Sequence, residues 1–235
     1  RDEQNRGVRL STEPGMHRGV WDLSTEPAAR VPGQFLYGGS GSYRVAPGTY
    51  TVRLVSGETT ITHAFEVRED PRLEVRSYTE QQDLLSRLSG IVDAMHQNVV
   101  ALAKARKKID ALRADWDDDE LEQMAAELTE AMQSWEDEIV QRDQKTFQDV
   151  INFPNRLSAN VLNLLGQIDG SGPGVNRGAQ ERFADLQLAW QQLEAEYQEL
   201  IGSRLDELNA AIERARMPAI RVKTYAKPAE RSGGR

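Results

Sequence analysis

The chain has 235 residues, with 29 lysines and arginines against 37 aspartates and glutamates and a formal net charge of −8. This acidic balance argues against nucleic acid as a partner. The sequence has no cysteine, which excludes disulfides, Cys-ligated zinc and thiol catalysis, and it has no apolar run long enough to predict a membrane span.

The hydrophobic pattern changes abruptly at Asp70-Pro71. Residues before this dipeptide alternate as strands do, and residues after it repeat at the spacing of long helices. We therefore predict an α+β protein of two modules. A small Ig-like antiparallel β-sandwich, complete or incomplete, covers residues 1–76, and an elongated antiparallel bundle of three to four helices covers 77–216. Residues 217–235 have a net charge of +4, and we predict that they form a basic, extended tail.

Two segments of the β module have strand patterns. Residues 16–24 predict one strand. Residues 48–69 predict a hairpin with one apolar face, because apolar residues alternate on both sides of a turn at Ser56-Gly57-Glu58. Residues 26–42 are rich in Pro, Gly and Ser and predict a long loop.

Three strands are fewer than the roughly seven of an Ig-like sandwich. The apolar face of the hairpin therefore needs a cover: strands upstream or unrecognised, which we favour, or the helices, or another chain. Residues 219–225 alternate Ile220, Val222 and Thr224 and are a candidate additional strand. The sequence begins at Arg1 and not at Met, so we expect a processed product or a piece of a longer protein.

Four helices with short connections are predicted after the break, which indicates an up-down bundle. Their predicted ranges are 79–113, 118–148, 155–168 and 177–216. The apolar spacing of the last one slips after Leu200, which is typical of a stutter. Trp135 and Trp190 continue the apolar stripes and predict core positions, and Trp116 is expected to cap the bundle end, although sugar-stacking platforms are the alternative.

The acidic run 117–120 predicts the start of a helix, where carboxylates complement the N-terminus. A calcium site is the alternative, but the run lacks the central Gly and distal Glu of an EF-hand loop. Lys104, Arg106, Lys107 and Lys108 form a basic cluster, which predicts a solvated helix face or, alternatively, an anionic contact.

No catalytic, cofactor-binding or metal-binding residue is predicted. His17, His63 and His96 fall in three separate elements, so we expect no zinc site. Residues 38–41 are glycine-rich but precede no helix, which argues against phosphate binding. Paired carboxylates for glycoside hydrolysis stay open, because none can be singled out in so acidic a chain.

Four segments, in order, resemble one family: HRGVWDL at 17–23, APGTYTVRL at 46–54, FEVREDPR at 65–72 and FQDVINFPNRL at 147–157. Over about residues 15–215, the chain is similar to the C-terminal region of large secreted bacterial proteins with a sortilin-type, Asp-box β-propeller, described as glycosyl hydrolase-like. The resemblance implies an Ig-like domain, then a helical region, in an exported, periplasmic or cell-surface protein. It carries no catalytic residue to this chain.

These observations favour a non-enzymatic accessory region of a larger protein, serving assembly or protein binding. The expected partner is an upstream propeller or another chain. One alternative is a support region of a hydrolase whose active site lies in a propeller. The other is a carbohydrate-binding module.

Overall fold

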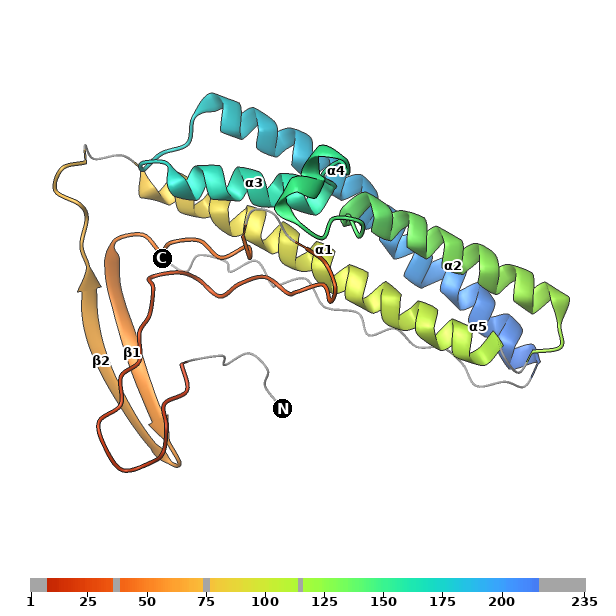
Figure 1. The fold of residues 1–235 in the computed structure, drawn as a ribbon, viewed down its shortest axis with the longest axis horizontal. Helices are drawn as coiled ribbons and strands as arrows, with labels where there is room; N and C mark the ends of the chain where they lie inside the picture. Colours follow the sequence, from red (N-terminus) through yellow and green to blue (C-terminus); the bar gives the residue numbers. More distant parts are fainter. Residues whose placement is uncertain (1–7, 36–38, 74–76, 114–115, 216–235) are drawn as a thin grey trace, which may run out of the picture.

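The computed structural model describes residues 8–35, 39–73, 77–113 and 116–215. A two-stranded antiparallel sheet stands at one end of a long helical bundle, which confirms the α+β class (Figure 1). A full Ig-like sandwich is not seen in these ranges. The elements are β1 (Gly48–Ser56), β2 (Thr59–Val67), α1 (Tyr78–Arg113), α2 (Asp119–Ile139), η1 (Phe147–Ile151), α3 (Leu157–Gly170), α4 (Arg177–Glu199), η2 (Leu200–Arg204) and α5 (Leu205–Arg214).

Helix α1 is the axis of the bundle. Its 36 residues span about 54 Å at 1.5 Å per residue. Helix α3 packs along its first half and α2 along its second, while α4 and α5 run beside them (Figure 1). Most of the apolar stripe that predicted this helix is buried, namely Leu84, Leu88, Met95, Leu102, Ala105 and Ile109, while Ile91 and Leu112 of the same stripe are partly buried.

The second helix is shorter than predicted, because α2 ends at Ile139 and not at Gln148. Beyond it, a side chain satisfies backbone groups that a longer helix would have used. The Asp149 carboxylate accepts hydrogen bonds from the backbone N–H groups of Lys145 and Thr146, at 2.7 and 2.8 Å. Such local side-chain bonds compete with helix formation, and the chain forms the short 3₁₀ turn η1 instead.

The slip in the last helix is confirmed as a turn of π-helix. This turn, η2, lies between α4 and α5, and Gly202 within it has φ −93° and ψ −107°. The wider turn shifts the helical phase. Helix α4 accordingly packs mainly on α3, whereas α5 packs on α2.

The strand predicted at 16–24 is wrong. Within the described part of the chain, residues 16–24 form no strand, and the one β-bridge they make joins Ser24 to Arg44. Leu23 takes a left-handed backbone, with φ +61°, which breaks the extended run. The Asp22 carboxylate accepts a hydrogen bond from the Ser24 N–H at 3.0 Å and favours a turn there.

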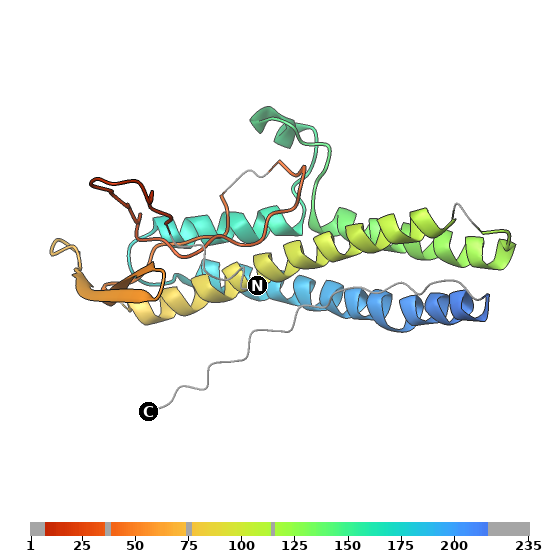
Figure 2. The ribbon, with the colours of Figure 1, turned by 90° about the horizontal axis from the view of Figure 1, so that it is seen from below.

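The predicted hairpin forms from β1 and β2, with Tyr50 opposite Phe65 and Leu54 opposite Ile61. Gly57, at the tip, has φ +57°, a conformation that favours glycine in two-residue hairpin loops. No described helix contacts either strand, and Figure 2 shows the hairpin projecting from one end of the bundle. The helices, one of the covers considered above, therefore do not cover its apolar face.

The long loop predicted at 26–42 belongs to a segment that we call the strap, residues 23–35 and 39–45. It has no regular secondary structure but runs along α1 and α3 (Figures 1 and 2). Ala28 and Val31 are buried in the bundle core. Gly41, with φ +77°, passes so close that an added Cβ would lie 2.9 Å from the Ala28 Cβ. The predicted tail 217–235, with its candidate strand at 219–225, lies outside the described residues.

Candidate functional site

One face of the hairpin carries its apolar side chains. Because side chains alternate along strands and the register pairs Leu54 with Ile61, Val52 lies on the same face as both. Val52 is 54% exposed, Leu54 49% and Ile61 60%. Three large apolar side chains half exposed on one small sheet are a typical mark of an interaction surface.

Aromatic side chains cover only the base of this face. Trp21 packs on Tyr50 and Phe65, with ring centroids 5.5 and 6.0 Å apart. Its indole N–H donates to the Ser24 carbonyl at 2.8 Å, which fixes the ring. The sequence HRGVWDL thus supplies a lid over the aromatic end and leaves the aliphatic end bare. We define Val52, Leu54 and Ile61 as the hairpin patch.

The backbone edges of the hairpin are also unused. Within the described ranges, no main-chain hydrogen bond joins β1 or β2 to another element. An exposed edge is a template for an added strand. The hairpin can therefore offer a partner both its patch and an edge.

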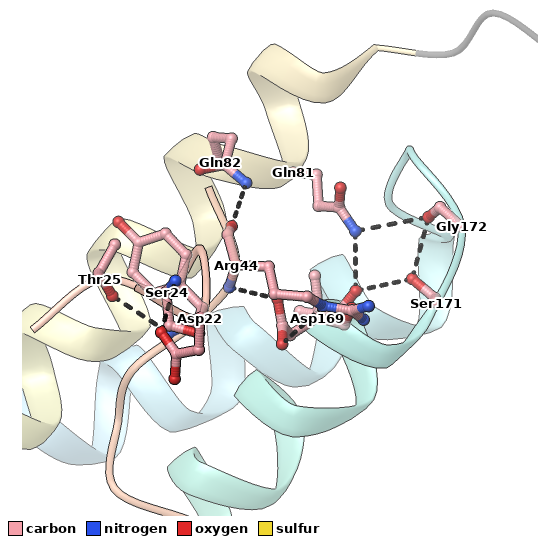
Figure 3. Close-up of polar contacts among 11 residues, drawn as sticks. Asp22, Ser24, Thr25, Arg44, Gln81, Gln82, Asp169, Ser171 and Gly172 are labelled. Atoms are coloured by element: carbon pink, nitrogen blue, oxygen red, sulfur yellow. Dashed lines mark hydrogen bonds and ion pairs between the residues drawn. The ribbon is translucent and has the colours of Figure 1, made fainter. Parts of the chain in front are cut away.

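The base of the hairpin is fixed to the bundle through Arg44 (Figure 3). Its backbone N–H donates to Asp169 Oδ1 at 2.8 Å, and its guanidinium lies 3.5 Å from Asp169 Oδ2. Gln82 Nε2 donates to the Arg44 carbonyl at 3.0 Å. One strap residue is thus bound by α1 and by the end of α3, four residues before β1 begins.

Farther along, α1 binds the backbone of Ala29 on both sides. The Asp93 carboxylate accepts from the Ala29 N–H at 2.8 Å, and His96 Nδ1 lies 2.6 Å from the Ala29 carbonyl oxygen. His96 Nε2 lies 2.6 Å from Ser158 Oγ on α3. Burial lowers the pKa of His96 below its ordinary value, against the opposing effects of the Ala29 hydrogen bond and the Asp93 charge.

Ser158 and His96 have the spacing of a nucleophile and its base, but both are buried. His96 is 1% and Ser158 0% exposed, so a substrate cannot reach the pair in this arrangement of the chain. Nor do the described residues contain three His, Cys, Asp or Glu side chains placed to bind a metal ion.

The acidic run starts a helix, as predicted. The Asp118 carboxylate caps α2 by accepting from the backbone N–H groups of Glu120 and Leu121, at 3.0 and 3.1 Å. Glu122 pairs with Arg113 at the same end of the bundle, and this hydrogen bond lowers the pKa of Glu122. Asp118 is thus the N-cap of α2, and Glu122 is engaged by Arg113.

Two tryptophans of the bundle, Trp135 and Trp190, are buried core residues, as predicted. The Trp135 indole N–H donates to the Leu193 carbonyl at 2.7 Å, and its ring packs 5.4 Å from the Tyr197 ring. Trp116 is half-buried against the end of the core, consistent with a cap.

The prediction of a solvated basic cluster is wrong for one of its members. Lys104, Lys107 and Lys108 are exposed, but Arg106 points inward and pairs with Glu136, which is fully buried. Arg142 binds the same carboxylate, with Nε 2.8 Å from Oε1.

This buried Arg106–Glu136–Arg142 triad also holds the strap, because Arg142 Nη1 donates to the Pro32 carbonyl at 2.7 Å. Sequence reasoning missed Glu136 and the role of His96. Glu136 lies four residues after Met132 and three before Ile139, and His96 lies four after Val92 and three before Val99, so each is on a buried helix face. A polar residue in that position is a signal of a buried pair.

Comparison with protein-family models, curated proteins and solved structures finds no significant match to this chain. None of the described helices combines the length and apolarity that crossing a membrane would need.

Proposed function

We propose that this chain is a non-enzymatic interaction region of a larger, exported bacterial β-propeller protein, and that it binds a protein partner through the hairpin. The observation that supports this most is the bare hairpin patch on a sheet that touches no helix. A two-stranded hairpin is at best marginally stable alone in water. A partner that covers the patch would stabilise it.

The bundle suits a rigid support in this proposal. Arg44 is bound by Gln82 of α1 and Asp169 of α3, which fixes where the hairpin leaves the bundle. The Ig-like assignment is part of the proposal: strands of the partner would extend β1 or β2 and complete a sandwich over the patch. The propeller context and export rest on the resemblance of the four sequence segments alone.

Hydrogen exchange provides the test. In the whole gene product, the amides of 48–67 should exchange more slowly than in this chain alone, and Leu54→Lys should abolish the difference. Val55→Lys is the matched control, because Val55 is 56% exposed on the opposite face of the same strand.

Equal exchange in the two proteins would refute the proposal. An identical effect of the two lysine variants would also refute it, because the patch would then have no special role.

The alternative, a support region of a hydrolase, would use the same hairpin and bundle. It differs from the proposal only in giving the propeller a catalytic activity. A carbohydrate-binding role loses two of its three candidate tryptophans, because Trp135 and Trp190 are buried in the core while Trp116 is only partly buried.

A further inference from the structure

His96 occupies the crossing point of three elements. It belongs to α1, its Nε2 faces Ser158 of α3, and its Nδ1 faces the carbonyl of Ala29 in the strap. His96 and Ser158 are both buried, and Ala28 and Val31 of the strap are buried beside them in the same core. The contact lies outside the hairpin patch and is not used by the proposed function.

The partners of His96 define its protonation state. A backbone carbonyl can only accept a hydrogen bond, so Nδ1 carries the proton that binds Ala29. The Ser158 hydroxyl can donate or accept, so in the neutral ring Nε2 accepts from it. A second proton on the ring would leave both hydrogen bonds in place, since the Ser158 hydroxyl can rotate to accept from Nε2–H. It would, however, place a positive charge on a side chain that is only 1% exposed, and this burial disfavours the charged ring.

We propose that His96 is an acid-sensitive latch, and that its protonation releases the strap around Ala29 from the bundle. When the strap lifts, water reaches the imidazole, and the Ser158 hydroxyl can turn toward solvent. The protonated and the neutral imidazole thus favour different positions of the strap, which is the requirement for a switch.

The other groups around the ring are consistent with this assignment. On α1, Asp93 favours the charged ring, but it is already engaged by the N–H of Ala29 and by Gln97. On α3, the facing group is the uncharged Ser158, and Arg30 on the strap is exposed. The permanently charged Arg142 binds Pro32, so we expect the strap to stay tethered beyond the latch.

The pH range follows from the direction of the shift. The folded pKa is lowered, so the neutral ring stabilises the closed strap above the ordinary value of about 6.5, and this stabilisation is lost as the pH falls below it. The opening equilibrium should therefore rise between pH 7.5 and pH 5.0, by at most roughly 30-fold, the limit for a ring that titrates at its ordinary value when the strap is open and does not titrate when it is closed.

The test is amide exchange of the full chain at these two pH values, corrected for the intrinsic pH dependence of exchange. The reporter amide is that of Ala29, which donates to Asp93 of α1 in the closed strap, whereas the Ala28 amide bonds to Ser40 within the strap and reports only on the strap itself. The Ala29 amide should lose protection at pH 5.0 in the wild type. It should not do so in His96→Gln, whose amide can donate and accept as the neutral ring does but cannot titrate.

His63→Gln is the control, because His63 is exposed on β2 and should leave the wild-type response unchanged. If His96→Gln does not fold, the wild-type chain still decides: deprotection of Ala29 must follow the titration of the His96 imidazole seen by NMR. Equal pH responses in the wild type and His96→Gln, or protection of Ala29 unaltered while His96 titrates, would overturn the latch. Because no partner enters the measurement, its outcome is independent of the proposed function.

Discussion

The buried Arg106–Glu136–Arg142 triad makes the sharpest stability prediction. Glu136→Gln preserves shape and removes the charge that both guanidinium groups share. Removing one partner of a buried ion pair costs about 3–5 kcal/mol. Arg142 can turn to solvent, because its side chain is 34% exposed, whereas Arg106 is 16% exposed and stays unpaired. We therefore expect about 3 kcal/mol, the lower end of that range.

Urea and thermal unfolding followed by circular dichroism measure this loss. For a chain of this size, each 1 kcal/mol lowers Tm by about 2–4 °C, so Glu136→Gln should melt about 6–12 °C below the wild type. Glu138→Gln is the matched control. Glu138 is a neighbouring glutamate that pairs with Arg156 at 3.6 Å on the surface, and its loss should change stability by less than about 0.5 kcal/mol.

A double variant separates lost pairing from general disruption of the core. Glu136→Met with Arg106→Leu removes both buried charges and fills the site with apolar atoms, so it should recover much of the loss. A Glu136→Gln chain as stable as Glu138→Gln would refute the claim that the triad is desolvated.

Three further predictions concern the core, the strap and the chemistry. Trp135→Ala and Trp190→Ala should each lower the free energy of unfolding by about 3–5 kcal/mol in the same assay, without loss of any glycan ligand; normal melting with lost glycan binding would favour the carbohydrate module. Residues 1–76 alone should be unfolded or aggregated, because the strap binds Asp93 and His96 of the bundle; sharp, dispersed amide resonances would contradict this. The chain alone should show only background turnover of glycoside, ester and peptide substrates, and an activity abolished by one substitution would contradict that.

Local pattern predicted the regular elements well. Alternation placed the hairpin, and the apolar repeat placed α1 within one residue of its observed start. Even the π-turn after Leu200 was signalled, as a slip in spacing. These features depend on neighbours within one or two turns, which is why the sequence alone predicts them.

The missed features depend on contacts between distant residues. Nothing near Ala29 indicates that Asp93 and His96, more than sixty residues away, bind its backbone. The prediction that the whole basic cluster is solvated failed for the same reason. Arg106 differs from its exposed neighbours only because α2 packs on α1 and brings Glu136 to it. The end of α2 was missed because no Pro or Gly follows Ile139 to mark it, and the Asp149 side chain that caps the next turn, η1, lies ten residues farther on.

Because of the π-turn, α4 and α5 follow one another without a loop but pack on two different helices, α3 and α2. Each helical residue advances by about 100°, so deleting Gly202 to restore ordinary winding would rotate everything that follows by about that angle. Leu205, Leu208 and Ile212, now buried, would leave the interface with α2 and face water. The far end of the bundle is therefore sensitive to chain length at this position, and a deletion there should be more harmful than most substitutions.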